Sequence, residues 1–255
     1  DLVRSRGLGD VYKRQIIAIL ISYLFDRGIS WLAKQRFPIH YNKHCSKQPV
    51  PKGNCDIRIR DISSRYGSDT VLSHFSYTFE KGFIYGITAP SGTGKTTLLN
   101  LIGNILKPAQ GEIETDFKTG IAYVFQEPEL LSQLTIAENI ALPLAAYLKK
   151  EIAFEQAISI LQKMELDGFE NRFPNELSFG QQQRAAIARA LTYPSPLLLM
   201  DEPFKGLDEA LSRRIIKRIR ERQTENGQTI LFTSHNPGEL HLFADKTVRL
   251  DPTSH

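Results

Sequence analysis

A glycine-rich segment between an apolar strand and a helix constrains the fold of this chain more than any other feature. Residues 89–97 read APSGTGKTT, after the apolar run 83–88 and at the start of a helical pattern over 95–105. Glycines carry no Cβ, so the backbone N–H groups of such a segment can close around a phosphate at the N-terminus of the helix. In this strand-to-helix context the segment is typical of a phosphate-binding loop, with an idle glycine-rich turn as the alternative.

The positions of this loop have expected roles. Lys95 would reach the β and γ phosphates of a nucleotide, and the Thr96 hydroxyl would ligate Mg²⁺. Ala89 replaces the glycine that is usual at the first position, which strains the loop only if φ must be positive there. The residues predicted to contact the nucleotide are Ser91, Gly92, Thr93, Gly94, Lys95, Thr96 and Thr97.

A second apolar strand ends in two carboxylates. Residues 197–201 read LLLMD, and Glu202 follows them. Parallel strands present side chains at their carboxyl edge, where the ligands of open α/β sheets bind. Asp201 is therefore predicted to hold Mg²⁺ directly or through water, and Glu202 to accept a proton from the attacking water. A cap for the following helix is the alternative.

A third segment, residues 177–181, reads LSFGQ directly ahead of a helical pattern. Ser178 and Gly180 would make a second helix N-terminus able to bind an anion, and an ordinary helix cap would look the same. At this point the chain resembles the ATP-binding subunits of ABC transporters, whose LSGGQ signature it matches as LSFGQ. Phe179 departs from that signature and is expected to modulate the contact rather than abolish it.

The resemblance covers about residues 56–252 and implies further site residues. Tyr66 is similar to the aromatic residue that stacks on adenine, with a plain edge-strand tyrosine as the alternative. Gln126 resembles the glutamine that senses Mg²⁺ and water and touches the permease, and His235 resembles the switch histidine that contacts the γ-phosphate. The implied catalytic residues are Lys95, Gln126, Glu202 and His235; the implied metal site is Thr96, Gln126 and Asp201; Tyr66, Ser178, Gly180 and Gln181 complete the nucleotide-binding set.

Strands alternate with helices after residue 56, which predicts an α/β fold. Apolar and polar residues alternate over 56–62 and 71–79, favouring an antiparallel β edge on a mostly parallel sheet. Together with the phosphate-binding loop, this pattern predicts a P-loop NTPase, and the resemblance implies a small helical subdomain at about 127–178. The expected parallel strands are 83–88, 121–125, 197–201, 229–233 and 247–250, and the expected helices are 95–105, 136–148, 152–164, 181–193 and 208–225.

The first 55 residues differ in composition from the rest. They hold 10 Lys and Arg against 3 Asp and Glu, whereas residues 56–255 hold 22 against 25, so the charge gives no argument for binding nucleic acid. Residues 1–15 resemble an artefactual or unstructured terminus. The apolar run 16–25 is too short to span a bilayer alone, and with the basic linker to residue 55 it resembles the end of a permease helix. An amphipathic terminal helix is the alternative.

Two sequence counts narrow the class of protein further. Cys45 and Cys55 are the only two cysteines, which favours a reducing compartment over a disulfide scaffold. Between Gln126 and Leu177 there are 50 residues, too few for a long coiled-coil arm of the kind that chromosome-maintenance relatives carry. Few residues follow the last expected strand, so an appended regulatory domain is not expected.

The resemblance implies an ATP-binding and ATP-hydrolysing subunit of an ABC transporter on the cytoplasmic face of the cell membrane, working with ATP and Mg²⁺. Its expected partners are integral membrane permease subunits, a second copy of the chain in the ATP-bound state, and a solute-binding protein, with no nucleic acid. The fragments NIALPL and MDEPFKGLD resemble importers of the nitrate, sulfonate and taurine type. The alternatives are the ATPase of a lipid or lipoprotein exporter, a soluble ABC ATPase, and a small-molecule kinase, against which LSFGQ argues.

Overall fold

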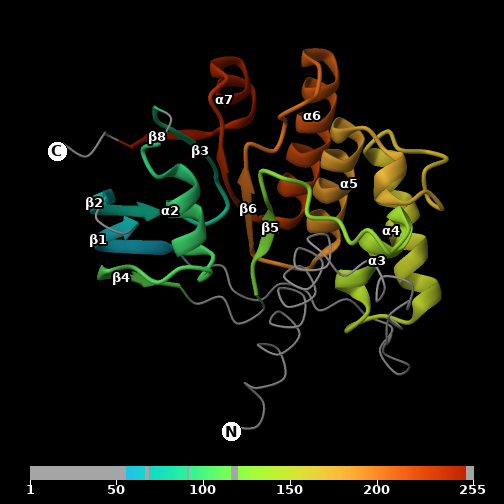
Figure 1. Ribbon diagram of the computed structural model, residues 1–255, viewed down its shortest axis with the longest axis horizontal. Coiled ribbons are helices and arrows are strands. Elements are labelled where there is room, and N and C mark those ends of the chain that lie inside the picture. Colours follow the sequence, from blue (N-terminus) through green and yellow to red (C-terminus); the bar gives the residue numbers. More distant parts are fainter. Residues whose placement is uncertain (1–55, 67–68, 91, 116–119, 251–255) are drawn as a thin grey trace, which may run out of the picture. The chain divides into compact units, whose positions relative to one another are not determined.

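The computed structural model describes residues 56–66, 69–90, 92–115 and 120–250 (Figure 1). The predictions for residues 1–15 and 16–55, and for Ser91, lie outside the described residues. The chain divides into two compact units. One is Glu127–Pro194, and the other joins the described residues up to Gln126 with those from Ser195 onward.

The second of these units holds two sheets. Its antiparallel sheet has the strand order β2-β1-β4. Residue Ile59 on β1 is opposite Tyr77 on one side and Ile113 on the other, so the apolar residues of these strands share one face. The strands are β1 (Ile57–Tyr66), β2 (Asp69–Phe79) and β4 (Gln110–Glu114).

The other sheet of this unit is entirely parallel, with the order β5-β6-β7-β3-β8. Every residue of β5, β6 and β7 is buried, which explains why these strands read as continuous apolar runs rather than alternating ones. Because the strands are parallel, their carboxyl ends meet at one edge. The strands are β3 (Ile84–Thr88), β5 (Ala122–Val124), β6 (Leu197–Asp201), β7 (Thr229–Thr233) and β8 (Lys246–Arg249).

Three helices complete this unit: α2 (Lys95–Ile102), α6 (Glu209–Asn226) and α7 (Pro237–Phe243). Helix α2 packs on β2 as well as on β6 and β7, and Figure 1 shows it beside the antiparallel strands. Side chains of both sheets and of α2 therefore form one hydrophobic core, with the rings of Phe79 and Tyr85 in edge contact at 5.0 Å between their centroids.

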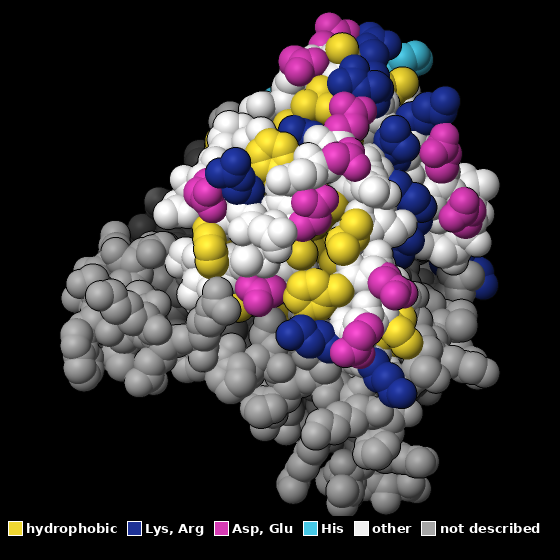
Figure 2. Space-filling model, turned by 90° about the vertical axis from the view of Figure 1, so that its right-hand side faces the viewer, with side chains coloured by type: hydrophobic (Ala, Val, Ile, Leu, Met, Phe, Trp, Pro, Cys, Tyr) yellow, Lys and Arg dark blue, Asp and Glu magenta, His cyan; other side chains and the backbone are white. Residues whose placement is uncertain are grey.

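The unit Glu127–Pro194 is helical, and its helices α3, α4 and α5 pack against one another. Thr135 and Glu138 form a capping box at the start of α3, and the buried Asn139 amide donates to the Leu131 and Leu134 carbonyls. Figure 2 shows hydrophobic side chains in small groups among charged ones on the side where α3 and α4 lie in Figure 1. The elements are α3 (Ile136–Ala141), the 3₁₀ turns Leu142–Leu144 and Pro174–Glu176, α4 (Lys150–Lys163) and α5 (Phe179–Thr192).

The predicted fold class is confirmed, and several details differ from it. The antiparallel strands form a separate sheet instead of an edge of the parallel one, and β4 and α7 were not predicted. The expected helix 136–148 is shorter, since Pro143 lies in a 3₁₀ turn that follows α3. Among the described residues, no helix has both the length and the apolar character that crossing a membrane requires.

Candidate functional site

The candidate site lies at the carboxyl ends of three neighbouring strands of the parallel sheet. Strand β7 lies between β6 and β3, and all three run in the same direction. The phosphate-binding loop follows β3, Asp201 and Glu202 stand at the end of β6, and His235 follows β7. Segments far apart in the sequence therefore meet at one edge of the sheet, as expected for a ligand site of an open α/β fold.

The phosphate-binding loop has the backbone that its glycines allow. Gly94, with φ of 88°, is the N-cap of α2, and a Cβ there would lie 2.9 Å from the carbonyl oxygen of Val71 on β2. Gly92 also has a positive φ, 81°, and a Cβ there would meet no atom within 4 Å, so the loop is open on that side. Ala89 is not one of the described non-glycine residues that have a positive φ. Alanine in place of the usual glycine therefore causes no backbone strain at this position.

Lys95 is held across the phosphate-binding loop. Its side chain is buried, with 7% of the residue exposed, and Nζ donates to the carbonyl oxygens of Ala89 at 3.0 Å and Pro90 at 3.4 Å. Burial lowers the pKa of Lys95, while the negative charges of Glu202 and Asp201 act to raise it. A buried ammonium group that donates to carbonyl oxygens keeps its positive charge and attracts an anion.

Asp201 has a buried carboxylate, and each of its two oxygens accepts a hydrogen bond from a threonine hydroxyl. Thr96 Oγ1 donates to Oδ2 at 2.7 Å, and Thr233 Oγ1 donates to Oδ1 at 2.6 Å. Asp201 is 3% exposed, whereas Thr96 is exposed to solvent. The structure thus joins the first helical turn after the loop to the ends of β6 and β7 through one carboxyl group.

Glu202 and His235 form a second contact at this edge. His235 Nε2 lies 3.0 Å from Glu202 Oε1. Glu202 has φ of 45°, in the left-handed region that is unfavourable for a side chain with a Cβ. Its backbone N–H donates to Thr233 Oγ1 at 2.9 Å, and this bond helps hold the strained residue in place.

The Thr96 hydroxyl and the Asp201 carboxylate fit a magnesium ion that keeps other ligands from outside the protein. Mg²⁺ is typically bound by one or two protein oxygens together with phosphates and water, rather than by a protein cage. In the described part of the chain, no three His, Cys, Asp or Glu side chains gather into a metal-binding group. The donor set present is therefore that of a Mg²⁺ carried in with a nucleotide.

The remaining predicted residues of this unit are Thr93, Thr97, Gln126 and Tyr66. Thr93 is buried and Thr97 is half-buried. Gln126 follows β5 and is exposed, and within the described ranges no hydrogen bond joins its side chain to the Asp201 carboxylate. Tyr66 ends β1, and its side chain lies outside the description.

The signature residues belong to the helical unit. Ser178 is the N-cap of α5: its hydroxyl accepts from the backbone N–H of Gln181 at 3.4 Å, and Gln181 Oε1 accepts from the backbone N–H of Ser178 at 2.8 Å. This capping box starts α5 at Phe179, two residues before the predicted start. Gly180 is half-buried, and Phe179 is 36% exposed.

Two further polar residues of the strand-end region, Thr233 and Glu239, were missed by the sequence predictions. Thr233 bonds both Asp201 and the backbone of Glu202. Glu239, on α7, accepts a hydrogen bond from the hydroxyl of Ser234, the residue before His235. The position of Thr233 at the carboxyl end of a buried strand was the available signal, since that edge carries the ligand side chains in parallel sheets.

Comparisons with known proteins identify the family of the chain. The family model described as "ABC transporter" matches residues 72–205, and one described as "AAA domain, putative AbiEii toxin, Type IV TA system" matches residues 170–241. The thiamine import ATP-binding protein ThiQ of Shigella boydii serotype 4 (strain Sb227) is 38% identical over 202 residues, which are 75% of this chain and 86% of ThiQ.

A second relative and a solved structure support the same assignment. The Fe(3+) ions import ATP-binding protein FbpC of Escherichia coli O157:H7 is 33% identical over 200 residues, and the match spans 57% of FbpC and 74% of this chain. The dimeric, post-hydrolysis ATP-binding cassette MJ0796 bound to ADP and Pi superposes with a TM-score of 0.70 at 30% identity, covering 76% of this chain and 94% of that one. The chain belongs to the family of ABC transporter ATP-binding proteins, and it is an ATPase that works with ATP and Mg²⁺.

Proposed function

We propose that the chain is the subunit that hydrolyses ATP to power a separate membrane permease in the import of a small solute. The observation that carries the proposal is the pairing at the sheet edge, where Thr96 bonds Asp201 and His235 contacts Glu202. The names of ThiQ and FbpC, both import ATP-binding proteins, support the direction of transport.

In the proposed mechanism the residues at the carboxyl edge of the parallel sheet have different roles. Lys95 would supply positive charge to the phosphates, and Thr96 and Asp201 would hold Mg²⁺, which would neutralise phosphate charge. Glu202 accepts the proton of the attacking water on its carboxylate, and His235 keeps that carboxylate oriented. Little covalent chemistry is required of the protein, so positioning and charge account for most of the rate.

The active state is proposed to be a dimer of two copies, in which Ser178, Gly180 and Gln181 of one copy contact the nucleotide of the other. Helix α5 of this chain begins at that segment, with Ser178 as its N-cap, and the N-terminus of a helix favours negative charge. The dimeric form of MJ0796 supports this arrangement. Gln126 is proposed to sense Mg²⁺ and to touch a permease subunit at the cytoplasmic face of the membrane, and Tyr66 and Ser91 are proposed to contact the nucleotide.

The solute is proposed to be small and delivered by a solute-binding protein. The fragments NIALPL and MDEPFKGLD favour nitrate, a sulfonate or taurine. The relatives named for thiamine and Fe(3+) make these two solutes the competing candidates. The division of the chain stays a proposal as well: an ATPase domain at 56–252 with a helical subdomain at about 127–178, preceded by a permease-like end at 16–55.

Two measurements test the proposal separately. The purified full chain, given MgATP and no organic acceptor, should release inorganic phosphate, and the specific rate should rise with protein concentration if two copies form the active state. Phosphate that appears only on an added acceptor would refute the ATPase subunit and favour a kinase. Deletion of the coding sequence in its source organism should abolish high-affinity uptake of taurine, a sulfonate or nitrate, and loss of thiamine or Fe³⁺ uptake instead would correct the solute.

A further inference from the structure

The segment that carries His235 is fastened to the start of α7. Ser234 is 3% exposed, and its hydroxyl donates to Glu239 Oε2 while accepting from the backbone N–H of Asn236 at 3.0 Å. The Asn236 side chain in turn caps α7 by accepting from the N–H of Gly238 at 2.9 Å. The residues on both sides of His235 are therefore fixed by the first turn of this helix.

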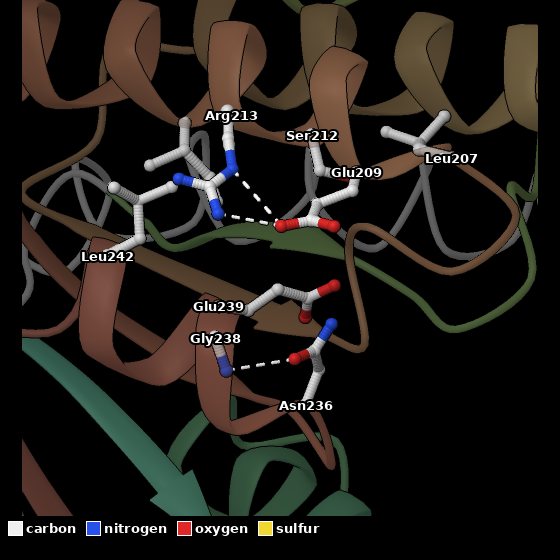
Figure 3. A pocket seen from close by; sticks show the side chains of 9 residues that line it. Leu207, Glu209, Ser212, Arg213, Asn236, Gly238, Glu239 and Leu242 are labelled. Carbon is white, nitrogen blue, oxygen red and sulfur yellow. Dashed lines mark hydrogen bonds and ion pairs between the residues drawn. The ribbon is translucent and has the colours of Figure 1, made fainter.

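Glu239 lies in the wall of a cavity of about 240 Å³ between α6 and α7. Figure 3 shows Glu239 and Asn236 on one side of it, and Glu209, Ser212 and Arg213 of α6 on the other. Glu209 is paired with Arg213 at 2.6 Å on the opposite wall, whereas the Glu239 carboxyl group turns to the Ser234 hydroxyl.

The surroundings of Glu239, burial above all, shift its pKa upward. Burial raises the pKa of Glu239, the hydrogen bonds from Ser234 and Asn236 lower it, and the negative charge of Glu202 raises it further. Either form of the carboxyl group keeps an oxygen that accepts the Ser234 hydroxyl. The bond therefore depends on the presence of this acceptor and not on its charge.

His235 needs such an anchor because nearly half of its own side chain is exposed. Its side chain is 45% exposed, and the chain leaves the parallel sheet one residue earlier, where the Ser234 N–H makes the last bond to β3, at 3.4 Å to Ile87 O. The direction of the imidazole is then set by the backbone at residues 234 and 236. An error of about 1 Å in the placement of a catalytic group costs about 10²-fold in rate.

We propose that Glu239 is a positioning residue for ATP hydrolysis: by holding the Ser234 hydroxyl, it keeps the His235 imidazole against the Glu202 carboxylate. This inference rests on the proposed roles of Glu202 and His235. It adds a residue of α7 that is not among the residues predicted to bind the nucleotide or the metal.

The kinetic test uses the full chain and compares kcat and KM for MgATP among four proteins: wild type, Glu239→Ala, Glu239→Gln and Glu209→Ala. Glu239→Ala should lower kcat about 10-fold and leave KM within about 2-fold, because orientation is lost and nucleotide binding is not. Glu239→Gln should restore kcat, since the amide oxygen still accepts the Ser234 hydroxyl. Glu209→Ala is the matched control: it removes a carboxylate from the opposite wall of the same cavity and should leave kcat unchanged.

A second readout needs no nucleotide. In NMR spectra of histidine-labelled protein, the ring signals assigned to His235 through their loss in His235→Gln should shift in Glu239→Ala and stay in place in Glu209→Ala. If Glu239→Ala does not fold, Ser234→Ala removes the same bond from the other side and should reproduce both effects.

Three results would overturn the inference: unchanged kcat and unchanged His235 signals in Glu239→Ala, a Glu239→Gln variant as slow as Glu239→Ala, or an equal loss in Glu209→Ala. A wild-type chain without ATPase activity would refute the proposed function instead. In that case the His235 signals still decide whether Glu239 positions the imidazole.

Discussion

Replacement of Thr233 by valine tests the two hydrogen bonds that its hydroxyl makes at the ends of β6 and β7. The Thr233 residue is fully buried, donates its hydroxyl to Asp201 at 2.6 Å and accepts the Glu202 N–H at 2.9 Å. Valine keeps the shape and removes both bonds. A hydrogen bond to a charged group contributes about 1.5–3 kcal/mol, and a buried N–H left without a partner costs about 1–3 kcal/mol. We therefore expect Thr233→Val to lower the free energy of unfolding by about 3 kcal/mol.

For a domain of this size, that loss should lower the melting temperature by about 6–12 °C, measured by calorimetry on the full chain without nucleotide. Thr233→Ser is the control: it keeps the hydroxyl and loses one methyl group, which costs about 1 kcal/mol. A valine variant as stable as wild type would refute the reasoning. So would a serine variant that loses as much as the valine variant, because packing rather than hydrogen bonding would then explain the effect.

Three other predictions concern charge. Glu202→Gln should slow hydrolysis about 10²-fold or more and accumulate as an ATP-bound dimer, because the amide keeps the shape and accepts no proton; light scattering that finds a monomer with both ATP and ADP would contradict this. Lys95→Ala should lose ATP binding, whereas Gln126→Ala should bind ATP nearly normally and couple poorly to transport. Equal losses of ATP binding in the two variants would refute this division of roles between Lys95 and Gln126. Burial raises the pKa of Glu239, so the stability contributed by its neutral form is complete below the ordinary carboxyl range and is lost as the pH rises through the raised value. The melting temperature of Glu239→Gln relative to wild type should therefore increase from about pH 5 to about pH 8, and a constant difference would contradict it.

The charged residues at the strand ends could be placed from the sequence, because apolar runs followed by Lys95 or Asp201 have few other interpretations in an α/β chain. The structure brings Thr96 to Asp201 and His235 to Glu202. Thr233 gave no comparable signal. A threonine in the run TILFT is an ordinary strand residue by composition, and its hydrogen bonds depend on neighbours that only the tertiary fold supplies.

The missed elements have weak sequence patterns for identifiable reasons. Strand β4 is mostly exposed, so it has neither an apolar run nor a clear alternation. Helix α7 has seven residues, too few for a helical period to show, although Asn236 followed by Pro237 is a helix-start signal. The start of α5 could have been placed at Phe179 from Ser178 and Gln181, whose spacing is that of a capping box.

The central place of β7 also determines when a growing chain can first form this site. Chains emerge from the ribosome N-terminus first, so β3 and the phosphate-binding loop are made long before β7. Because β7 lies between β6 and β3, Asp201 cannot be brought to the loop until that strand has been synthesised and inserted. Pairing of such distant segments is a slow step of folding. The nascent chain is therefore expected to complete its nucleotide site late, and from that point ATP binding stabilises the folded domain.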